Sequence, residues 1–146
     1  YYVRAYATNS KGTAYGDQLS FSTATNPPTV STGSVTSVTT TSAMGSGNVT
    51  SDGGNTVTER GLCWGSTSTP TVAGPHTASG SGLGEFTAAM TGLSPNTTYF
   101  VRAYAINGTD TAYGEAVSFT TLSISVPGVT TATATNISYT SATSAT

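Results

Sequence analysis

The 146-residue sequence predicts an all-β protein made of short strands, and three observations carry this prediction. Thr and Ser are abundant, with 32 Thr and 20 Ser, whereas only 7% of residues are charged, against about 25% in ordinary domains. Threonine, valine and tyrosine favour strands, and Gly, Asn, Asp and Ser favour the turns between strands. No window of ten or more residues shows the apolar spacing of an amphipathic helix.

An internal repeat organises the chain. Residues 1–23 and 99–121 are identical at 14 of 23 positions without a gap, at an offset of 98 residues, and residues 28–43 align with 127–142 at an offset of 99. The repeat predicts a tandem array of units about 98 residues long. We assign 1–25 to the C-terminal strands of one unit, 26–122 to a complete unit and 123–146 to the N-terminal strands of the next. Both ends then lie inside a unit, either as a window on a longer array or as half-units completed by neighbouring chains.

The strands of the complete unit follow from alternation of apolar and polar residues. Residues 56–64 form one predicted strand, in which Gly61 is expected to mark a bulge. Residues 65–84 are rich in Gly, Pro, Ser and Thr and predict a loop with one short edge strand. Seven short strands with turns near every tenth residue predict a β-sandwich. The residues expected to face its core are Ala43, Gly45, Gly47, Val49, Val57, Leu62, Trp64, Phe86, Ala88, Met90, Tyr99, Val101, Ala103, Ala105, Val117 and Phe119.

The most specific local pattern is LSPNTTYFVRA, from Leu93 to Ala103. It resembles the L-x-P-x-T-x-Y-x-V-x-A signature of fibronectin type III modules. It is still more similar to the Thr-rich tandem variant of bacterial surface and secreted proteins, with ERG-x-CW, PNTTYYVRAYA and GTAYG motifs. The resemblance implies an immunoglobulin-like or fibronectin type III-like sandwich in which Leu93 packs under a turn, Pro95 fixes it and the Tyr99 hydroxyl ties the corner to the backbone. Trp64 lies on the third predicted strand, whereas the core Trp of animal modules lies on the second.

Composition and charge exclude several classes of function. A net charge of −2 with four Lys and Arg cannot neutralise a nucleic-acid backbone. No run of eighteen apolar residues occurs, so we expect no membrane insertion in this segment. Cys63 is the single cysteine and provides neither an internal disulfide nor a metal cluster. We expect no cofactor, no metal site and no nucleic-acid partner.

Catalysis receives no support from the titratable residues. His76 has no Asp or Glu within eight positions. Cys63 beside Trp64 is most simply a small strand residue, with a reactive thiol as the less favoured alternative. Residues 52–55 contain one Asp and one Asn, too few oxygen ligands for calcium, and are expected to form a turn. The sequence therefore predicts no enzyme and no catalytic residues.

Four Asn-x-Ser/Thr sequons begin at Asn48, Asn96, Asn107 and Asn136. We expect Asn48 on an outer face and Asn96 and Asn107 at loop tips, where a glycan would leave the core undisturbed. If the source is bacterial, Ser- or Thr-linked sugars are an equal alternative. Glycans would supply the hydration that the few charges do not.

Aromatic residues flank an arginine on two equivalent strands. A guanidinium between aromatic rings at ±2 can stack on them by cation–π contacts. The pattern is either a repeated contact face, for a neighbouring module or a polysaccharide, or an ordinary outer-sheet stripe. The residues concerned are Phe100, Arg102 and Tyr104 in one unit and Tyr2, Arg4 and Tyr6 in the other.

These features predict a non-catalytic structural repeat of an extracellular or cell-surface protein or filament. It would serve as a stalk, spacer or fibre subunit and associate with copies of itself or with neighbouring repeats. The linkers at 24–28 and 122–127 contain prolines, which favour extended geometry and limit swivelling. The alternative is an adhesin or a carbohydrate-binding accessory module of a secreted enzyme, with glycans as partners.

Overall fold

The structure is a computed structural model that describes residues 1–135, 138 and 143–144. Every regular element in these residues is a strand, which confirms the all-β prediction. Among the same residues, no helix has the length and apolar character needed to cross a membrane.

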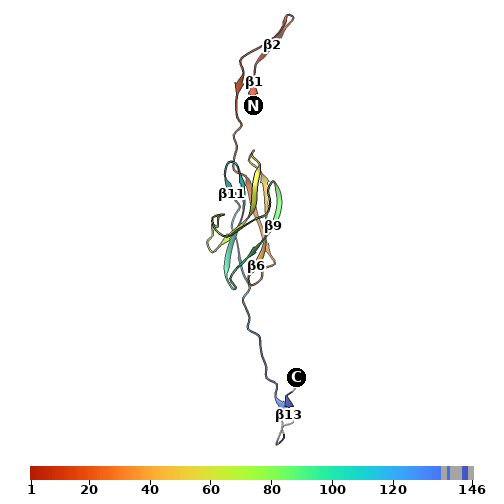
Figure 1. Ribbon diagram of the computed structural model, residues 1–146, viewed down its shortest axis with the longest axis vertical. Helices are drawn as coiled ribbons and strands as arrows, with labels where there is room; N and C mark the ends of the chain where they lie inside the picture. Colours follow the sequence, from red (N-terminus) through yellow and green to blue (C-terminus); the bar gives the residue numbers. More distant parts are fainter. Residues whose placement is uncertain (136–137, 139–142, 145–146) are drawn as a thin grey trace.

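Two antiparallel sheets form a sandwich over residues 29–120 (Figure 1). The first contains β5 (Thr29–Thr36), β6 (Ser42–Ser51) and β9 (Gly84–Thr91), in the order β5-β6-β9. In the second, β7 lies between β8 and β10, while β11 and β12 pair with successive parts of β10. The unit thus has eight strands where seven were predicted, because the segment after Asn107 includes a short strand of its own. The strands of the second sheet are β7 (Val57–Gly65), β8 (His76–Ala78), β10 (Thr98–Asn107), β11 (Thr111–Tyr113) and β12 (Val117–Thr120).

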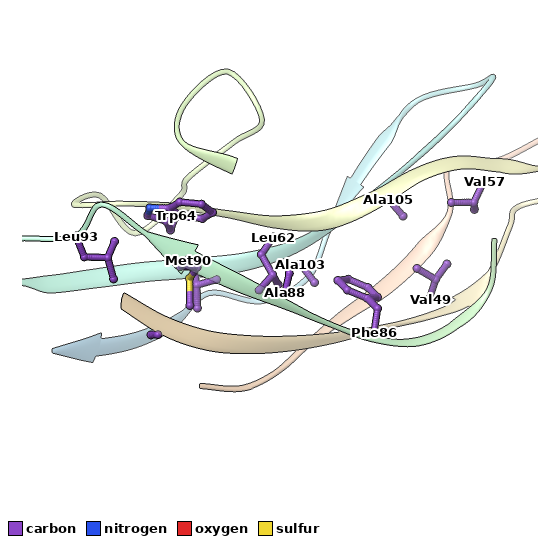
Figure 2. Packing of buried hydrophobic residues seen from close by; sticks show 12 residues of the cluster. Val49, Val57, Leu62, Trp64, Phe86, Ala88, Met90, Leu93, Ala103 and Ala105 are labelled. Carbon is purple, nitrogen blue, oxygen red and sulfur yellow. The ribbon is translucent and has the colours of Figure 1, made fainter. Parts of the chain in front are cut away.

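The core lies between the two sheets, and Figure 2 shows its side chains converging from both. Alternate residues of β6 are buried from Ala43 to Val49, as predicted. Two of these positions are glycines, because side chains of other strands occupy the space that their own side chains would take. A Cβ at Gly45 would strike Leu62, and one at Gly47 would strike the Phe86 ring and Ala103. Large residues of the facing and neighbouring strands therefore pack directly over the backbone of β6.

The bulge in β7 is real, but its predicted position at Gly61 is wrong. The register between β10 and β7 shifts where Ile106 pairs with Glu59 and Asn107 pairs with Val57, so Thr58 is the extra residue. Gly61 is needed for another reason. A Cβ there would collide with the carbonyl oxygen of Thr77 and lie 2.9 Å from the Tyr104 ring. The glycine lets β8 approach β7 on the outer face of the sheet.

The turn before β10 has the geometry that the sequence resemblance implies. The backbone N–H of Ser94 donates to the Tyr99 hydroxyl at 3.0 Å. Leu93 is buried and its own N–H donates to the carbonyl oxygen of Thr41 at 3.0 Å. Trp64 packs into the core from β7, the third strand of the sandwich.

Short hairpins lie on either side of the sandwich. At the N-terminal side, β1 (Tyr2–Val3) pairs with β4 (Leu19–Ser20), and β2 (Tyr6–Asn9) pairs with β3 (Gly12–Tyr15). All residues from 1 to 27 are exposed. On the other side, β13 (Ala134–Thr135) pairs with β14 (Thr143–Ser144).

Candidate functional site

Asn107 organises the end of the sandwich at which the chain enters. This residue ends β10 and is only 5% exposed. Its amide nitrogen donates to the carbonyl oxygens of Asn26 and Asp52, at 2.9 and 2.8 Å. Its amide oxygen accepts from the backbone N–H groups of Thr109 and Asp110, at 2.8 and 3.0 Å. One side chain thus joins the incoming linker, the turn after β6 and the loop after β10.

The expectation that Asn107 carries a glycan is therefore wrong. Its amide nitrogen, the atom to which a glycan would be attached, is buried and donates two hydrogen bonds. A glycan on this nitrogen would displace the hydrogen bonds to the carbonyl oxygens of Asn26 and Asp52. Asn107 is a structural residue.

The incoming linker is held at further points. The N–H of Asn26 donates to the carbonyl oxygen of Gly53 at 2.8 Å, and the Thr109 hydroxyl donates to that of Thr25 at 2.9 Å. Gly53 adopts a φ of +68°, and a Cβ there would collide with the Asn26 carbonyl. The predicted turn at 52–55 is thus confirmed, and the linker packs against it.

The outgoing chain is held at the opposite end. The N–H of Leu122 donates to the carbonyl oxygen of Thr39 at 2.9 Å. The buried Thr121 hydroxyl donates to the Ser94 carbonyl at 2.6 Å and accepts from the N–H of Thr97 at 3.0 Å. The ten-residue β10 runs from this end to Asn107, a distance of about 30 Å. Entry and exit therefore lie at opposite ends of the sandwich (Figure 1).

The predicted contact face on β10 is largely closed. Tyr104 lies outside the core but is 0% exposed, because β8 and the His76 ring, at 6.2 Å between centroids, cover it. Its hydroxyl donates to Glu59 at 2.7 Å; burial, and then this hydrogen bond, raise the pKa of Tyr104. Arg102 stacks on Tyr113, with the guanidinium carbon 4.7 Å from the ring centroid, and not on its neighbours at ±2. Phe100 is half-buried.

The equivalent residues near the N-terminus are open. Tyr2 and Tyr6 are both exposed. Arg4 donates from Nε to the carbonyl oxygen of Gly16 at 3.0 Å and stands 5.2 Å from the centroid of the Tyr15 ring. The two predicted stripes are thus alike in sequence but differ in burial, and the structure does not bring them together.

Cys63 and His76 are cross-strand partners on β7 and β8. The thiol is buried within hydrogen-bond distance of the carbonyl oxygens of Pro70 and Arg102, at 3.4 and 3.5 Å. Burial raises the pKa of Cys63 to about 11, against a smaller opposing effect of the Arg102 charge. The exposed His76 has Nδ1 2.8 Å from the Gly74 carbonyl oxygen. Since thiolates are the nucleophiles, this pair is not set up for attack at neutral pH.

No group of three or more His, Cys, Asp or Glu in the described ranges is placed to hold a metal ion. Of the remaining sequons, Asn48 is half-buried on the outer face of β6 and Asn96 is exposed in a turn. Asn136 lies outside the described residues. Glycosylation at these three positions stays a prediction.

A shallow groove on the outer face of β5, β6 and β9 was not predicted. It has a volume of about 430 Å³. The register of β5 and β6 shifts between Thr32 and Val35, and Gly33 lies in this irregular part of β5. The signal available in the sequence was a glycine inside a Val- and Thr-rich segment. The polar residues that line the groove are Ser31, Ser46, Asn48, Glu85 and Thr87.

Comparisons with known proteins bear on the fold. No family model and no curated protein matches the chain. Two solved structures of the sensor domain of the anti-sigma factor RsgI4 from Pseudobacteroides cellulosolvens are similar to it, each with a TM-score of 0.50. They are 22% and 21% identical, and the matches cover 68% and 71% of this chain and 98% of those chains. The 6th fibronectin type III domain from human fibronectin type III domain containing protein 3 is 29% identical, with a TM-score of 0.44, over 76% of this chain and 98% of that one. With its two antiparallel sheets and its tyrosine corner at Tyr99, residues 29–120 are an immunoglobulin-like, fibronectin type III-like β-sandwich.

Proposed function

We propose that the chain is a non-catalytic structural repeat of an extracellular or cell-surface protein, acting as a stalk, spacer or fibre subunit. The observation that carries the proposal is that the chain enters and leaves the sandwich at opposite ends and is hydrogen-bonded at both. We call the hydrogen bonds of Asn107 to the linker, the turn after β6 and the loop after β10 the clamp. The linker enters at the Asn107 end, the chain leaves at the Thr121 end, and hydrogen bonds hold both. A module of this kind fixes the distance between its two linkers and their relative orientation.

The chemistry of the side chains supports a non-catalytic role. The candidate nucleophile, Cys63, is buried with a raised pKa, and it serves as a packed strand residue. The outer-face tyrosine, Tyr104, is used in packing and in a hydrogen bond to Glu59. Groups of this kind stabilise a sheet and do not meet a substrate.

Self-association, a filament and glycosylation belong to the same proposal. The strands near the N-terminus are exposed, and pairing there with the strands of a neighbouring repeat would build an array or filament by strand addition. Asn48, half-buried on the outer face of β6, and the exposed Asn96 are positions at which glycans would compensate for the low surface charge. An intact mass equal to that of the bare sequence in material from the source organism would refute glycosylation without touching the spacer role.

A pair of spin labels tests the clamped path. One label is placed directly before the linker by Thr23→Cys and one on β9 by Thr87→Cys, in a Cys63→Ala background. We expect a single narrow distance distribution by double electron–electron resonance, and a broad one after Asn107→Ala. Asn48→Ala, an asparagine whose side chain is not part of the clamp, should leave the distribution narrow. A broad distribution in the parent protein would refute the spacer proposal, because an unclamped linker does not transmit direction.

The alternative function, an adhesin or carbohydrate-binding accessory module, is favoured by one observation. The groove over β5, β6 and β9 presents hydroxyl, amide and carboxylate groups that suit a sugar. Binding would be seen as shifts of the Ser46 and Thr87 amide resonances on titration with oligosaccharides. Loss of those shifts in Glu85→Ala would favour this function over the purely structural one.

A further inference from the structure

Residues 1–21 reproduce the strand pairing of β10, β11 and β12. β1 pairs with β4 in the register of β10 with β12, and β2 pairs with β3 in the register of β10 with β11, each displaced by 98 residues. The hairpins near the N-terminus thus have the backbone arrangement of three strands of the complete sandwich. The corresponding pairs are Tyr2–Ser20 with Phe100–Ser118, Val3–Leu19 with Val101–Val117, Tyr6–Tyr15 with Tyr104–Tyr113, and Ala7–Ala14 with Ala105–Ala112.

The side-chain contacts of these strands are reproduced as well. Arg4 makes the same hydrogen bond to the Gly16 carbonyl that Arg102 makes to Gly114, at 3.0 and 2.8 Å. The Tyr1 and Phe21 rings stack with centroids 5.6 Å apart and planes inclined by 25°. Their counterparts Tyr99 and Phe119 are 5.9 Å apart and inclined by 27°. Residues 1–21 are therefore a preformed half of a sandwich sheet.

In the described part of the chain, residues 1–21 are not covered by the strands that surround β10 in the complete unit. Val3 is 51% exposed and Tyr6 is 72% exposed, whereas their counterparts Val101 and Tyr104 are 0% exposed. In the complete unit, β7 pairs with β10 from Phe100 to Asn107, and β5 and β6 of the other sheet pack against β10. No strand takes these places beside β1 and β2 in the part of the chain that the structure describes. Isolated hairpins with an exposed apolar face are marginally stable in water.

Gly16 indicates which kind of strand is missing. A Cβ at its counterpart Gly114 would lie 2.5 Å from the backbone nitrogen and the hydroxyl of Thr32 on β5, so glycine is required there. At Gly16 a Cβ would meet only Ala5, at 3.7 and 3.8 Å. The glycine at position 16 has no steric reason in its present surroundings. A strand placed against Gly16 as β5 lies against Gly114 would provide the steric reason for a glycine there.

Asn9 shows the same half-completed arrangement. Its amide oxygen accepts from the N–H of Lys11 at 2.8 Å, as that of Asn107 accepts from Thr109. In Asn107 the amide nitrogen is used as well, for the linker and for the turn after β6. Asn9 thus keeps the local part of the clamp and lacks the part supplied by a β5–β6 segment.

We propose that the open face of residues 1–21 docks a polypeptide with the residue pattern of 26–98, the segment that carries β5 to β9, and completes a second sandwich with it. This inference rests on the proposed function, since a row of such sandwiches is what a stalk requires. A second copy of this chain is not a suitable partner. Its own β10 already pairs with its β7, and its Thr32 hydroxyl already accepts from the N–H of Ala103.

The test places a duplicate of residues 26–98 directly ahead of Tyr1 in the full chain. The duplicate supplies the missing strands with the connection that β10 has in the complete unit. We expect amide hydrogen exchange over residues 2–9 to slow by at least about a hundredfold relative to the unextended chain. Exchange over β6 and β10 of the original unit serves as the internal standard.

Gly16→Ala is the matched control. In the unextended chain it should change neither exchange nor stability, because its Cβ has room. In the extended chain it should abolish the added protection, because the Cβ would meet the new β5. Equal protection with and without this substitution would overturn the proposal, since the docked segment would then not lie as β5 lies on Gly114.

Two further outcomes overturn the proposal. One is rapid exchange over residues 2–9 in the extended chain while the original unit stays protected. The other is concentration-dependent protection of residues 2–9 in the unextended chain, which would identify a second copy as the occupant. The spin-label measurement at the Asn107 end is unaffected by either result, so failure of the docking is distinguishable from failure of the spacer role.

Discussion

At the scale of single residues, Asn107 and Cys63 show how burial assigns a role to a side chain that the sequence leaves open. Asn107 has the sequence context of a glycosylation site and the surroundings of a core residue. Cys63 is the only thiol in the chain, and it lies under a loop with two carbonyl oxygens nearby. In both residues the polar atoms are directed into the protein.

Replacing Asn107 by alanine removes four hydrogen bonds to partly buried backbone carbonyl and N–H groups. We expect Asn107→Ala to lower the free energy of unfolding by about 2–3 kcal/mol. Urea denaturation followed by Trp64 fluorescence measures the change. Asn48→Ala, on the outer face of β6, should stay within about 0.5 kcal/mol of the parent, and an equally small effect at Asn107 would contradict the clamp.

The raised pKa of Cys63 makes the stability depend on alkaline pH. The thiol ionises near its ordinary value of 9.0 when the chain is unfolded and at about 11 when it is folded. Between these values the folded protein binds more protons than the unfolded chain, so the free energy of unfolding falls as pH rises from 9 to 11. Below pH 9 the contribution of the protonated thiol is fully present.

Denaturation curves measured from pH 8 to pH 11 test this expectation. Cys63→Ala should show a shallower fall than the parent, with the remaining slope due to groups such as Tyr104, whose pKa is also raised. Identical slopes in the two proteins would show that the thiol is not sequestered.

At the scale of elements, glycines determine how closely strands approach. Gly45 and Gly47 let core side chains pack on the backbone of β6, and Gly61 lets β8 pack on β7. These glycines have ordinary strand conformations, so their value lies in the absent side chain and not in the freedom of the backbone.

Gly61→Ala tests this at β8. The new Cβ would collide with the Thr77 carbonyl, a backbone atom that cannot move without shifting the strand. We expect the free energy of unfolding to fall by about 1–3 kcal/mol and amide exchange over residues 76–79 to become faster. Gly65 lies on the same strand, and a Cβ there would be 3.8 Å from its nearest neighbour, Pro70. Gly65→Ala should therefore lower the free energy of unfolding far less. Equal losses would indicate a general effect of alanine in β7.

At the scale of the whole molecule, the sandwich is expected to be stable without the hairpins near the N-terminus. All residues from 1 to 23 are exposed, and the hydrogen bonds that join the linker to the sandwich begin at Thr25. A chain that starts at Ala24 should therefore unfold with a free energy within about 0.5 kcal/mol of the parent.

A chain that starts at Thr29 provides the contrast. It loses Asn26, the residue that donates to Gly53 and accepts from Asn107, and should be measurably less stable. Calorimetric unfolding of the two truncated proteins gives the comparison. A large loss already on removal of residues 1–23 would show that the hairpins contribute to the sandwich.

Much of the fold could be predicted from residue types and spacing. The alternation around Ala43 to Val49 identifies the buried face of β6, because side chains of a strand alternate with a period of two. The short motif around Tyr99 identifies the corner, because its hydrogen bond spans only five residues. The edge strand within 65–84 was likewise predicted, from the density of turn-forming residues around it.

The candidate sites were predicted less well, because alternation gives the face of a sheet and not what covers that face. Tyr104 was placed correctly outside the core, yet His76 and β8 bury it. Its partner Glu59 is 45 residues away, and the partner Asn26 of Asn107 is 81 residues away. Contacts over such separations depend on how loops and strands pack, which local patterns do not contain.

The sequence alone determined the all-β class, the alternation that builds the core, the corner at Tyr99 and the likeness of residues 1–23 to 99–121. Each follows from local stereochemistry or from comparison of the chain with itself. Only the tertiary structure decided that Asn107 links three segments, that Thr58 forms the bulge, and that Tyr6 is exposed where its counterpart Tyr104 is buried. These outcomes depend on which distant strand lies against each residue, and the same sequence motif is buried or exposed according to whether that strand is present.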